Sequence, residues 1–193
     1  IADDGELLIR GPEVMAGYYK GAEATRSAFT RDGWFKTGDI GVIDERGRLS
    51  ITGRIKDIIV TAGGKNISPQ NIENSLKGSK YIEQIAVIGD RRKYLSALII
   101  PAFDELGKWA KAKKIPAGDS SELVMNPDVR RLIAREIEQY TRQFSRVEQI
   151  RQFTLLNEEW TQGGGELTPT LKVKRMVIER KYAREIARMY SED

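Results

Sequence analysis

Residues that could handle a phosphorylated ligand are concentrated in one segment of the chain. The sequence GRIKDIIVTAGGKNISPQNIE, from Gly53 to Glu73, joins a basic turn, an apolar run, a glycine pair and a proline-started helix. Gly63 and Gly64 follow the apolar run, and backbone without Cβ atoms can take positive φ and admit a long ligand at close range. The structural alternative is a hairpin turn, where glycine pairs are common.

Charged residues before the glycine pair could bind a nucleotide. In WFKTGDI, Asp39 follows a glycine at the expected end of a strand, where its carboxylate could accept hydrogen bonds from the paired hydroxyls of a ribose. A turn or capping role is the structural alternative for Asp39. Arg54, Lys56 and Asp57 form a second charged group, for which the alternative is a solvated surface cluster.

Two lysines follow a glycine-rich segment near the end of the chain. GGGELTPTLKVKR places Lys172 and Lys174 on alternate positions of an extended stretch before a helix. A lysine after a flexible segment can move onto a phosphate or carboxylate oxygen and later leave it. A cation at a helix N-terminus is mildly unfavourable, so an anion is a fitting partner. A basic helix start on the surface is the alternative.

The composition excludes several kinds of chemistry. The 193 residues contain no cysteine and no histidine, which excludes disulfides, thiol nucleophiles, histidine triads and Cys or His metal ligands. With 40% hydrophobic and 31% charged residues the chain should fold. A net charge of +4 favours anionic partners such as nucleotides, but it is too small to indicate a nucleic-acid binder.

No targeting or membrane-spanning segment is predicted. The apolar runs are far shorter than the roughly 18 residues that a membrane span needs, and no signal peptide is visible, so we expect a soluble protein. The chain opens at Ile1, without an initiator methionine and within a strand-like stretch. We therefore expect a fragment of a longer protein.

The first part of the chain has a β-rich pattern. GELLIRG, GWFKTGDIGVID and ERGRLSI are short strand signals separated by turns, so the part up to Ser50 is predicted to be all-β. The pattern changes at Gly53, which predicts a domain boundary near Thr52 to Arg54. The predicted domains are residues 1–52 and 53–193.

The second part is predicted to be α+β, a small antiparallel sheet flanked by helices. SPQNIENSLKG indicates a helix with Ser68 as its cap, and QIAVIGD and YLSALIIPA form a hairpin through the turn DRRK. FDELGKWAKAKK is a short amphipathic helix. Asn126-Pro127 starts a longer helix with an apolar stripe formed by Val129, Leu132, Ile133, Ile137, Tyr140 and Phe144. The strand QIRQFTLL and a final helix with Met176, Val177, Tyr182 and Ile186 follow.

The order of these motifs resembles the adenylate-forming superfamily, which includes acyl-CoA synthetases, peptide adenylation domains and luciferases. GELLIRG with GYY, GWFKTGD, GRIKDIIVTAGGKNISPQNIE and LTPTLKVKR occur in sequence, and together they cover nearly the whole chain as the C-terminal part of such an enzyme. Leu171 stands where most of the superfamily has glycine. This form, with the long segment between YLSALIIPA and RQFTLL, looks like the long-chain fatty-acid branch.

The resemblance implies a role for each motif residue. Asp39 would bind the ribose hydroxyls of ATP or AMP, with a second contact from Arg54. Lys56 would be the hinge of a mobile C-terminal domain. Lys172 would serve adenylation, although Lys174 lies close enough to leave the assignment open. Gly63 and Gly64, which the superfamily places along the pantetheine path, would admit CoA.

The implied reaction has two steps. Fatty acid and ATP would give acyl-AMP and pyrophosphate, and rotation at Lys56 would then bring the glycine face to the pocket, where the CoA thiol displaces AMP. The phosphate loop, the Mg²⁺-binding glutamate and the acyl tunnel of the family would lie in a large N-terminal domain that this sequence lacks. Residues 1–52 would be its β-rich end. We therefore expect this piece alone to be inactive, and no metal ligands within it.

Other functions remain open from the sequence. One is a ligase for another carboxylic acid or for a carrier protein. Another is an anion-binding regulatory module that uses the basic last helix, for which a solvated face over a packed stripe is the structural alternative. Its basic residues are Lys174, Arg175, Arg180, Lys181, Arg184 and Arg188. We expect fatty acid, ATP, CoA and the enzyme's own N-terminal domain as partners, no nucleic acid, and a cytoplasmic location with peripheral association to the inner membrane face left open.

Overall fold

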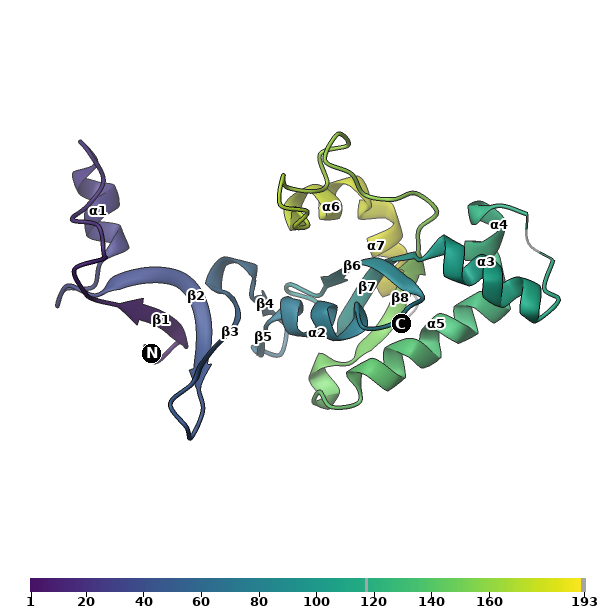
Figure 1. Ribbon diagram of the computed structural model, residues 1–193, viewed down its shortest axis with the longest axis horizontal. Coiled ribbons are helices and arrows are strands. Elements are labelled where there is room, and N and C mark those ends of the chain that lie inside the picture. The colour runs from purple at the N-terminus through teal and green to yellow at the C-terminus, as the bar shows by residue number, and fades with distance from the viewer. Residues whose placement is uncertain (117, 192–193) are drawn as a thin grey trace. The chain divides into compact units, whose positions relative to one another are not determined.

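The computed structural model describes residues 1–116 and 118–191 and divides into two compact units, Ile1–Ile58 and the chain from Ile59 onward. The ribbon in Figure 1 shows the elements of each unit. Strand pairing continues through Arg54, and the division between units follows Ile58, whereas the sequence pattern predicts a boundary near Thr52 to Arg54.

The first unit is a three-stranded antiparallel sheet with one short helix. Strands β1 (Glu6–Ile9), β2 (Phe35–Ile43) and β3 (Leu49–Arg54) are adjacent in that order, and the 3-10 turn η1 (Ile55–Asp57) follows. Helix α1 (Ala22–Ala28) is an addition to the all-β prediction. Its sequence carries no apolar stripe from which to predict a helix, and accordingly none of its residues is buried.

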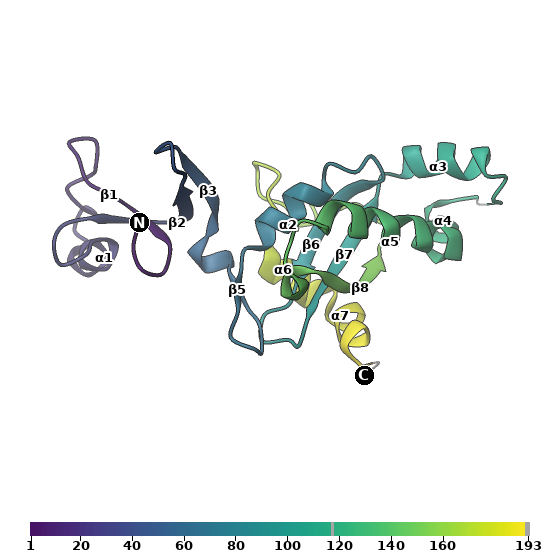
Figure 2. The same ribbon diagram turned by 90° about the horizontal axis from the view of Figure 1, so that it is seen from below.

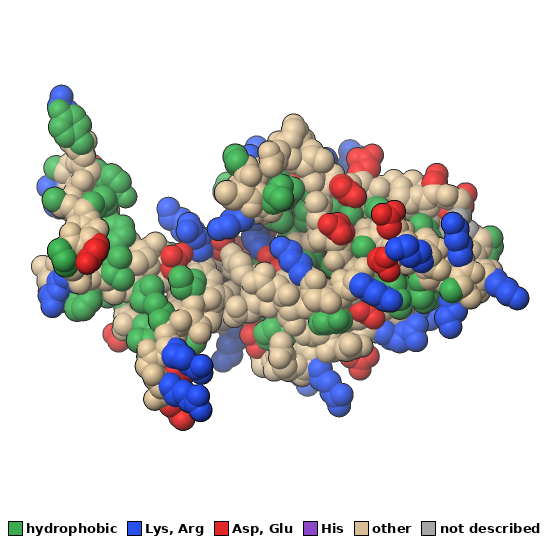
Figure 3. Space-filling model, viewed as in Figure 1, with side chains coloured by type: hydrophobic (Ala, Val, Ile, Leu, Met, Phe, Trp, Pro, Cys, Tyr) green, Lys and Arg blue, Asp and Glu red, His purple; other side chains and the backbone are tan. Residues whose placement is uncertain are grey.

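Large hydrophobic side chains are exposed on the first unit. Figure 3 shows green side chains on its visible surface. The exposed residues include Tyr18, Tyr19, Val42, Ile43, Leu49 and Ile51. Since three strands and a short helix cannot enclose these groups, the unit has little core of its own.

The second unit is built on the sheet β6-β7-β8. Strands β6 (Ile82–Ile88) and β7 (Leu95–Pro101) are antiparallel, as predicted, and β8 (Ile150–Leu155) joins β7 in parallel. A separate hairpin is formed by β4 (Ile59–Val60) and β5 (Asn66–Ile67). The predicted α+β class is confirmed, with a mixed sheet in place of a fully antiparallel one.

Helices cover both faces of this sheet (Figures 1 and 2). Ile85 and Val87 pack in a core with α2 (Pro69–Leu76), α3 (Phe103–Ala112), α4 (Ser120–Met125) and α5 (Pro127–Thr141). Ala86 and Ile88 point to the other face and pack with α6 (Arg175–Lys181) and α7 (Ala183–Tyr190). Burial on both faces explains why β6 and β7 are nearly continuous apolar runs. The 3-10 turn η2 (Arg146–Glu148) precedes β8.

The helix predictions hold in part. In α5 the stripe is buried at Val129, Leu132, Ile133 and Ile137, and the Asn126 side chain accepts a hydrogen bond from the Asp128 N–H at 2.8 Å. Ser68 precedes α2 without a capping bond, because its hydroxyl donates to Gln70 Oε1 at 3.3 Å.

The predicted final helix is two helices, which is a correction. Tyr182 ends α6 and precedes α7 with φ −106° and ψ 30°, outside helical values. The change of direction lets Ile178 and Ile186 both reach the same core. Met176, expected among the apolar residues of this region, is 77% exposed.

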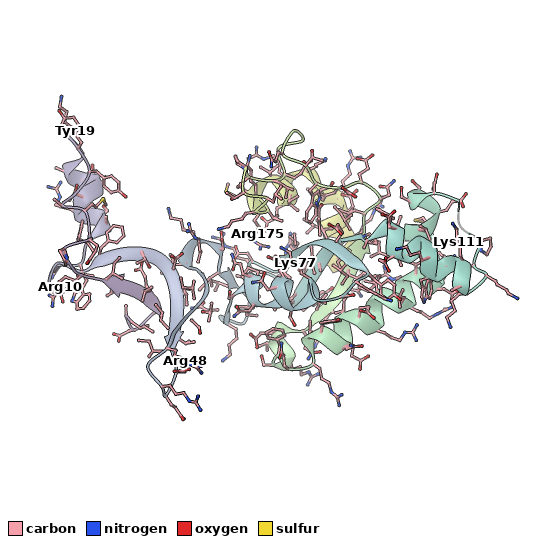
Figure 4. The ribbon with its side chains drawn as sticks, in the orientation of Figure 1. Arg10, Tyr19, Arg48, Lys77, Lys111 and Arg175 are labelled. Carbon is pink, nitrogen blue, oxygen red and sulfur yellow. The ribbon has the colours of Figure 1, made fainter. Side chains whose placement is uncertain are left out.

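Residues 167–174 form a segment that we call the lysine loop. An ion pair holds each end of this loop. Before the loop, Lys181 Nζ donates to Oε1 of the buried Glu166 at 2.5 Å, and this hydrogen bond lowers the pKa of Glu166. After the loop, Arg175 Nη2 lies 2.7 Å from Oε1 of the buried Glu73 on α2. Figure 4 labels Arg175, which extends from the start of α6 toward α2 and β6.

The Glu73–Arg175 pair also forms hydrogen bonds with the backbone of Val87 on strand β6. Glu73 Oε1 accepts the Val87 N–H at 2.8 Å, and another guanidinium N–H of Arg175 donates to the Val87 carbonyl oxygen. One carboxylate and one guanidinium therefore join α2, β6 and the end of the lysine loop. A buried carboxylate and a largely buried guanidinium paired in this way are costly to separate.

A left-handed residue lies at the tip of the lysine loop. Leu171 has φ +58° and its side chain is 65% exposed. The turn is closed by Thr168 N–H donating to the Lys172 carbonyl oxygen at 2.8 Å and by Lys172 N–H donating to Thr168 Oγ1 at 3.0 Å. A leucine in this conformation is strained by about 1 kcal/mol, whereas glycine is not.

We predict that Glu73→Gln destabilises the second unit by about 3 kcal/mol, since the partly buried Arg175 would keep its charge without a counter-charge. Urea unfolding followed by the fluorescence of the buried Trp160 measures this. Glu105→Gln, at the exposed pair with Lys108, is the matched control and should change the midpoint far less. Equal midpoints for the two variants would contradict the prediction.

We predict that Leu171→Gly leaves stability unchanged or raises it. Relief of left-handed strain offsets the entropy that glycine adds to the unfolded chain, which is about 0.4–1 kcal/mol. Thr170→Gly, next to it and without positive φ, should be destabilising by about that entropy. Denaturant midpoints compare the two, and a larger loss for Leu171→Gly would show that the leucine side chain stabilises the loop.

Candidate functional site

Asp39 and Arg54 form a charged pair on the first unit. They face each other on β2 and β3, and Arg54 Nε lies 3.0 Å from Asp39 Oδ1. Asp39 lies in the middle of β2, which corrects the expectation of a strand end. Its side chain is 23% exposed, so the carboxylate is accessible beside a guanidinium. Such a pair can accept hydrogen bonds from a diol and donate them to an anion.

The backbone around Asp39 is irregular, and hydrogen bonds to side chains hold it in place. Gly38 has φ +73°, and its N–H donates to the carboxylate of Glu6 at 2.9 Å. The Asp39 N–H donates to Thr37 Oγ1 at 3.0 Å. The pairing of β2 with β3 shifts register just after Ile40, as at a β-bulge, and bulges commonly redirect a side chain next to a site.

Lys56 lies in the short turn that ends the first unit. It is in η1, it is exposed, and the division between units follows Ile58. The flanking residues Arg54 and Ile58 have extended backbone, with ψ 140° and 131°. An exposed turn between two extended residues is a place where backbone torsions can change without disrupting a core.

Gly63 and Gly64 form the turn of the β4–β5 hairpin, so the structural alternative named from the sequence is present. Thr61 N–H donates to the Lys65 carbonyl oxygen at 3.1 Å and Gly64 N–H to the Thr61 carbonyl oxygen at 2.8 Å. Gly64 has φ +73°, and a Cβ there would meet no atom within 4 Å. The turn is open to close approach by a ligand, as the functional interpretation requires.

The two lysines of the lysine loop differ in their surroundings. Lys172 is exposed within the turn that Leu171 and Thr168 form. Lys174 is the N-cap residue of α6, and its N–H donates to the Glu166 carbonyl oxygen at 2.7 Å. Lys172 therefore lies on the turn that projects from the anchored ends, and Lys174 lies at one of those ends.

Gly64 and Lys172 belong to separate parts of the second unit. The β4–β5 hairpin and the loop that leads into α6 lie apart in both views of the ribbon (Figures 1 and 2). The structure thus brings Asp39 and Arg54 together in the first unit, and in the second it presents a glycine turn and a lysine loop at different places.

The residues that anchor the lysine loop could not be predicted from local patterns. Glu73 and Arg175 are 102 positions apart, and neither occurs in a pattern that indicates a partner.

Within the described residues, no three acidic side chains gather as a metal ion would require. No helix in residues 1–116 and 118–191 has the length and apolar character to cross a membrane.

Comparison with known proteins gives relatives over the whole chain. The long-chain-fatty-acid–CoA ligase FadD15 of Mycobacterium tuberculosis is 45% identical over 100% of this chain, and the chain spans 32% of that protein. The long chain acyl-CoA synthetase 6 of Arabidopsis thaliana is 37% identical over 97% of the chain, which spans 27% of it. The chain therefore corresponds to about a third or less of these relatives.

A solved structure and a family model agree with these relatives. The adenylation domain of a carboxylate reductase from Mycobacterium chelonae has a TM-score of 0.79 and 26% identity, and the match covers 97% of this chain and 28% of that one. The family model described as AMP-binding enzyme C-terminal domain matches residues 56–193. The chain belongs to the AMP-binding enzyme family and contains its C-terminal domain.

Proposed function

We propose that this chain is the C-terminal part of an AMP-forming long-chain fatty-acid–CoA ligase. The observation that carries the proposal is the separation of an open glycine turn at Gly64 from an exposed lysine at Lys172 on one α+β unit. Lys56 lies in the connection that precedes this unit. Relatives named as long-chain ligases, at up to 45% identity over the full chain, support the substrate class.

In the first half-reaction a fatty-acid carboxylate attacks the α-phosphate of ATP, and pyrophosphate leaves. The ammonium of Lys172 lies near the carboxylate and phosphate oxygens and offsets the charge that they bring together. Asp39 accepts hydrogen bonds from the ribose hydroxyls, and Arg54 holds that carboxylate in place through the ion pair at 3.0 Å. Mg²⁺ and the acyl chain bind in the N-terminal domain.

In the second half-reaction the C-terminal domain presents its glycine turn. Rotation at Lys56 removes Lys172 from the pocket and brings Gly63 and Gly64 to it. The pantetheine arm passes the open backbone, and the CoA thiol attacks the acyl carbonyl and displaces AMP. Because Gly64 and Lys172 lie apart, one pocket can receive them only in turn.

The surface of the first unit supports an N-terminal partner within the same protein. Tyr18 and Tyr19 are 51% and 90% exposed, and Val42, Ile43 and Ile51 are each more than half exposed. Exposed apolar groups in this number indicate a surface that another part of a protein covers. We propose that the preceding domain covers it and that residues 1–193 alone form no acyl-CoA.

A carrier-protein ligase is the second candidate. The chloroplastic protein AEE15 of Arabidopsis thaliana, 34% identical over 97% of this chain, is named a long-chain-fatty-acid–[acyl-carrier-protein] ligase. The same glycine turn would then admit the phosphopantetheine of a carrier protein. Incubating the full-length enzyme with fatty acid, ATP and either CoA or acyl carrier protein separates the two candidates by product.

We predict that Lys172→Ala in the full-length enzyme lowers the rate of acyl-AMP formation about 10²–10³-fold, the cost of losing one donor to developing charge. Fatty-acid-dependent exchange of pyrophosphate into ATP measures this step. Supplied acyl-AMP should still react with CoA at nearly the wild-type rate. Lys174→Ala is the control, and a larger loss there would assign the working lysine to Lys174.

For Gly64→Leu we predict the opposite effect on the two half-reactions. A side chain on the turn obstructs the pantetheine path, so acyl-CoA formation from acyl-AMP should fall at least tenfold while pyrophosphate exchange persists. Gly47→Leu is matched, because Gly47 also has positive φ, at +75°, with no atom within 4 Å of a Cβ. If both variants lost both half-reactions, general destabilisation would explain the effect and the role of Gly64 would be wrong.

A further inference from the structure

The lysine loop, which leads into α6 (Figure 1), is a hairpin with a packed base. Leu167 and Val173 pair there as an antiparallel bridge. Leu167 is buried in the core that contains α6 and α7, and Val173 packs against the same core. Nearer the tip, Thr168 N–H donates to the Lys172 carbonyl oxygen at 2.8 Å. Lys172 therefore lies on a closed turn, whereas the sequence predicts a flexible segment before it.

Glu166 holds the base of this hairpin through both its side chain and its backbone. The residue is 2% exposed, and its Oε1 accepts a hydrogen bond from Lys181 Nζ on α6 at 2.5 Å. Its Oε2 accepts the Thr161 N–H at 3.3 Å. Its carbonyl oxygen accepts the Lys174 N–H at 2.7 Å, two residues after Lys172. One residue thus joins the hairpin base to helix α6 and to the segment before the hairpin.

The segment before the hairpin is itself fixed to the sheet. Gln84 on β6 donates from Nε2 to the Trp160 carbonyl oxygen at 3.1 Å and accepts the Trp160 N–H at 2.7 Å. The Trp160 side chain is 1% exposed, and Thr161 follows it directly. Contacts therefore continue from β6, through the backbone of residues 160–161 and the Glu166 carboxylate, to the lysine loop.

A glycine at position 164 leaves room for the Glu166 carboxylate. A Cβ on Gly164 would lie 2.9 Å from Glu166 Cδ and closer still to Glu166 Oε2. A Cβ on Gly163, one residue earlier, would meet only Thr161 Oγ1, at 4.0 Å. Neither glycine has positive φ. The two positions therefore differ in the space that the Glu166 side chain occupies.

We propose that Glu166 is a positioning residue for Lys172 and that Lys181 and Gly164 act with it. The inference rests on the proposed function, because it takes Lys172 as the lysine of the first half-reaction. Rotation at Lys56 moves the second unit as one body, so Lys172 reaches the pocket in the orientation that the hairpin base gives it. A displacement of about 1 Å at reacting groups costs on the order of 100-fold in rate, so the hairpin base controls the rate of adenylation.

Glu166→Gln in the full-length enzyme tests this, because the amide keeps the size of the side chain and loses the charge that pairs with Lys181. Pyrophosphate exchange should fall about tenfold as the hairpin base loosens, and supplied acyl-AMP should still react with CoA at the wild-type rate. Lys181→Met should reproduce the loss of exchange. Lys181→Arg keeps the positive charge and should retain most of the wild-type rate.

Gly164→Ala and Gly163→Ala are a matched pair that leaves every charge in place. Alanine at position 164 forces the Glu166 carboxylate to move, so pyrophosphate exchange should fall severalfold. Alanine at position 163 meets no such group, and both half-reactions should keep their wild-type rates. This pair decides the matter if Glu166→Gln does not fold: equal exchange rates for the two alanine variants would overturn the proposal.

A double-mutant cycle shows whether Glu166 acts through Lys172. If it does, Glu166→Gln lowers pyrophosphate exchange in the wild-type enzyme and adds little to the loss in Lys172→Ala. Losses that multiply would reject a role through Lys172, and equal losses in the two half-reactions would show that Glu166 only supports the fold. Wild-type enzyme that forms no acyl-AMP would instead show that the proposed function is wrong, and the inference would fall with it.

Discussion

The buried contact between Glu73 and Arg175 is the interaction on which the second unit depends. Oε1 of one carboxylate receives both the Arg175 guanidinium and the Val87 N–H, so a helix, a strand and the end of the lysine loop share a single acceptor. The Arg175 guanidinium also donates to the Val87 carbonyl oxygen, so loss of the carboxylate would leave a largely buried charge without its counter-charge, which is costly. The lysine loop can be exposed and still well placed, because its two ends are held by buried acids at Glu73 and Glu166.

The sheet explains how one small unit can present two separate elements. Helices α2 to α5 bury one face and helices α6 and α7 the other, so the connections emerge at different positions around the sheet. The glycine hairpin belongs to the chain that enters α2, and the lysine loop to the chain that enters α6. A two-sided core therefore gives a rigid support with several usable turns, and rigid supports place functional loops reliably.

Local sequence patterns predicted much of the fold and of the candidate site. Contacts between residues far apart in the sequence account for what these patterns missed. The stripe of α5, the hairpin β6–β7 and the open turn at Gly64 follow from periodicity and from glycine chemistry, which act between near neighbours. Helix α1 was missed because it buries no residue, and the break at Tyr182 because the apolar spacing of α6 and α7 resembles one helix. The parallel pairing of β8 with β7 was not predictable, since the sequence pattern of a strand does not indicate whether its neighbour is parallel or antiparallel.

The contacts of Tyr190 bear on how the protein is made. Its hydroxyl donates to the carbonyl oxygens of Ile88 and Tyr94, and Ser96 donates to it in turn, so this residue completes the packing of strands synthesised about a hundred residues earlier. On the ribosome, one face of β6 and β7 therefore stays uncovered until α7 has left the exit tunnel. Apolar strands with an uncovered face are a target for chaperones during translation.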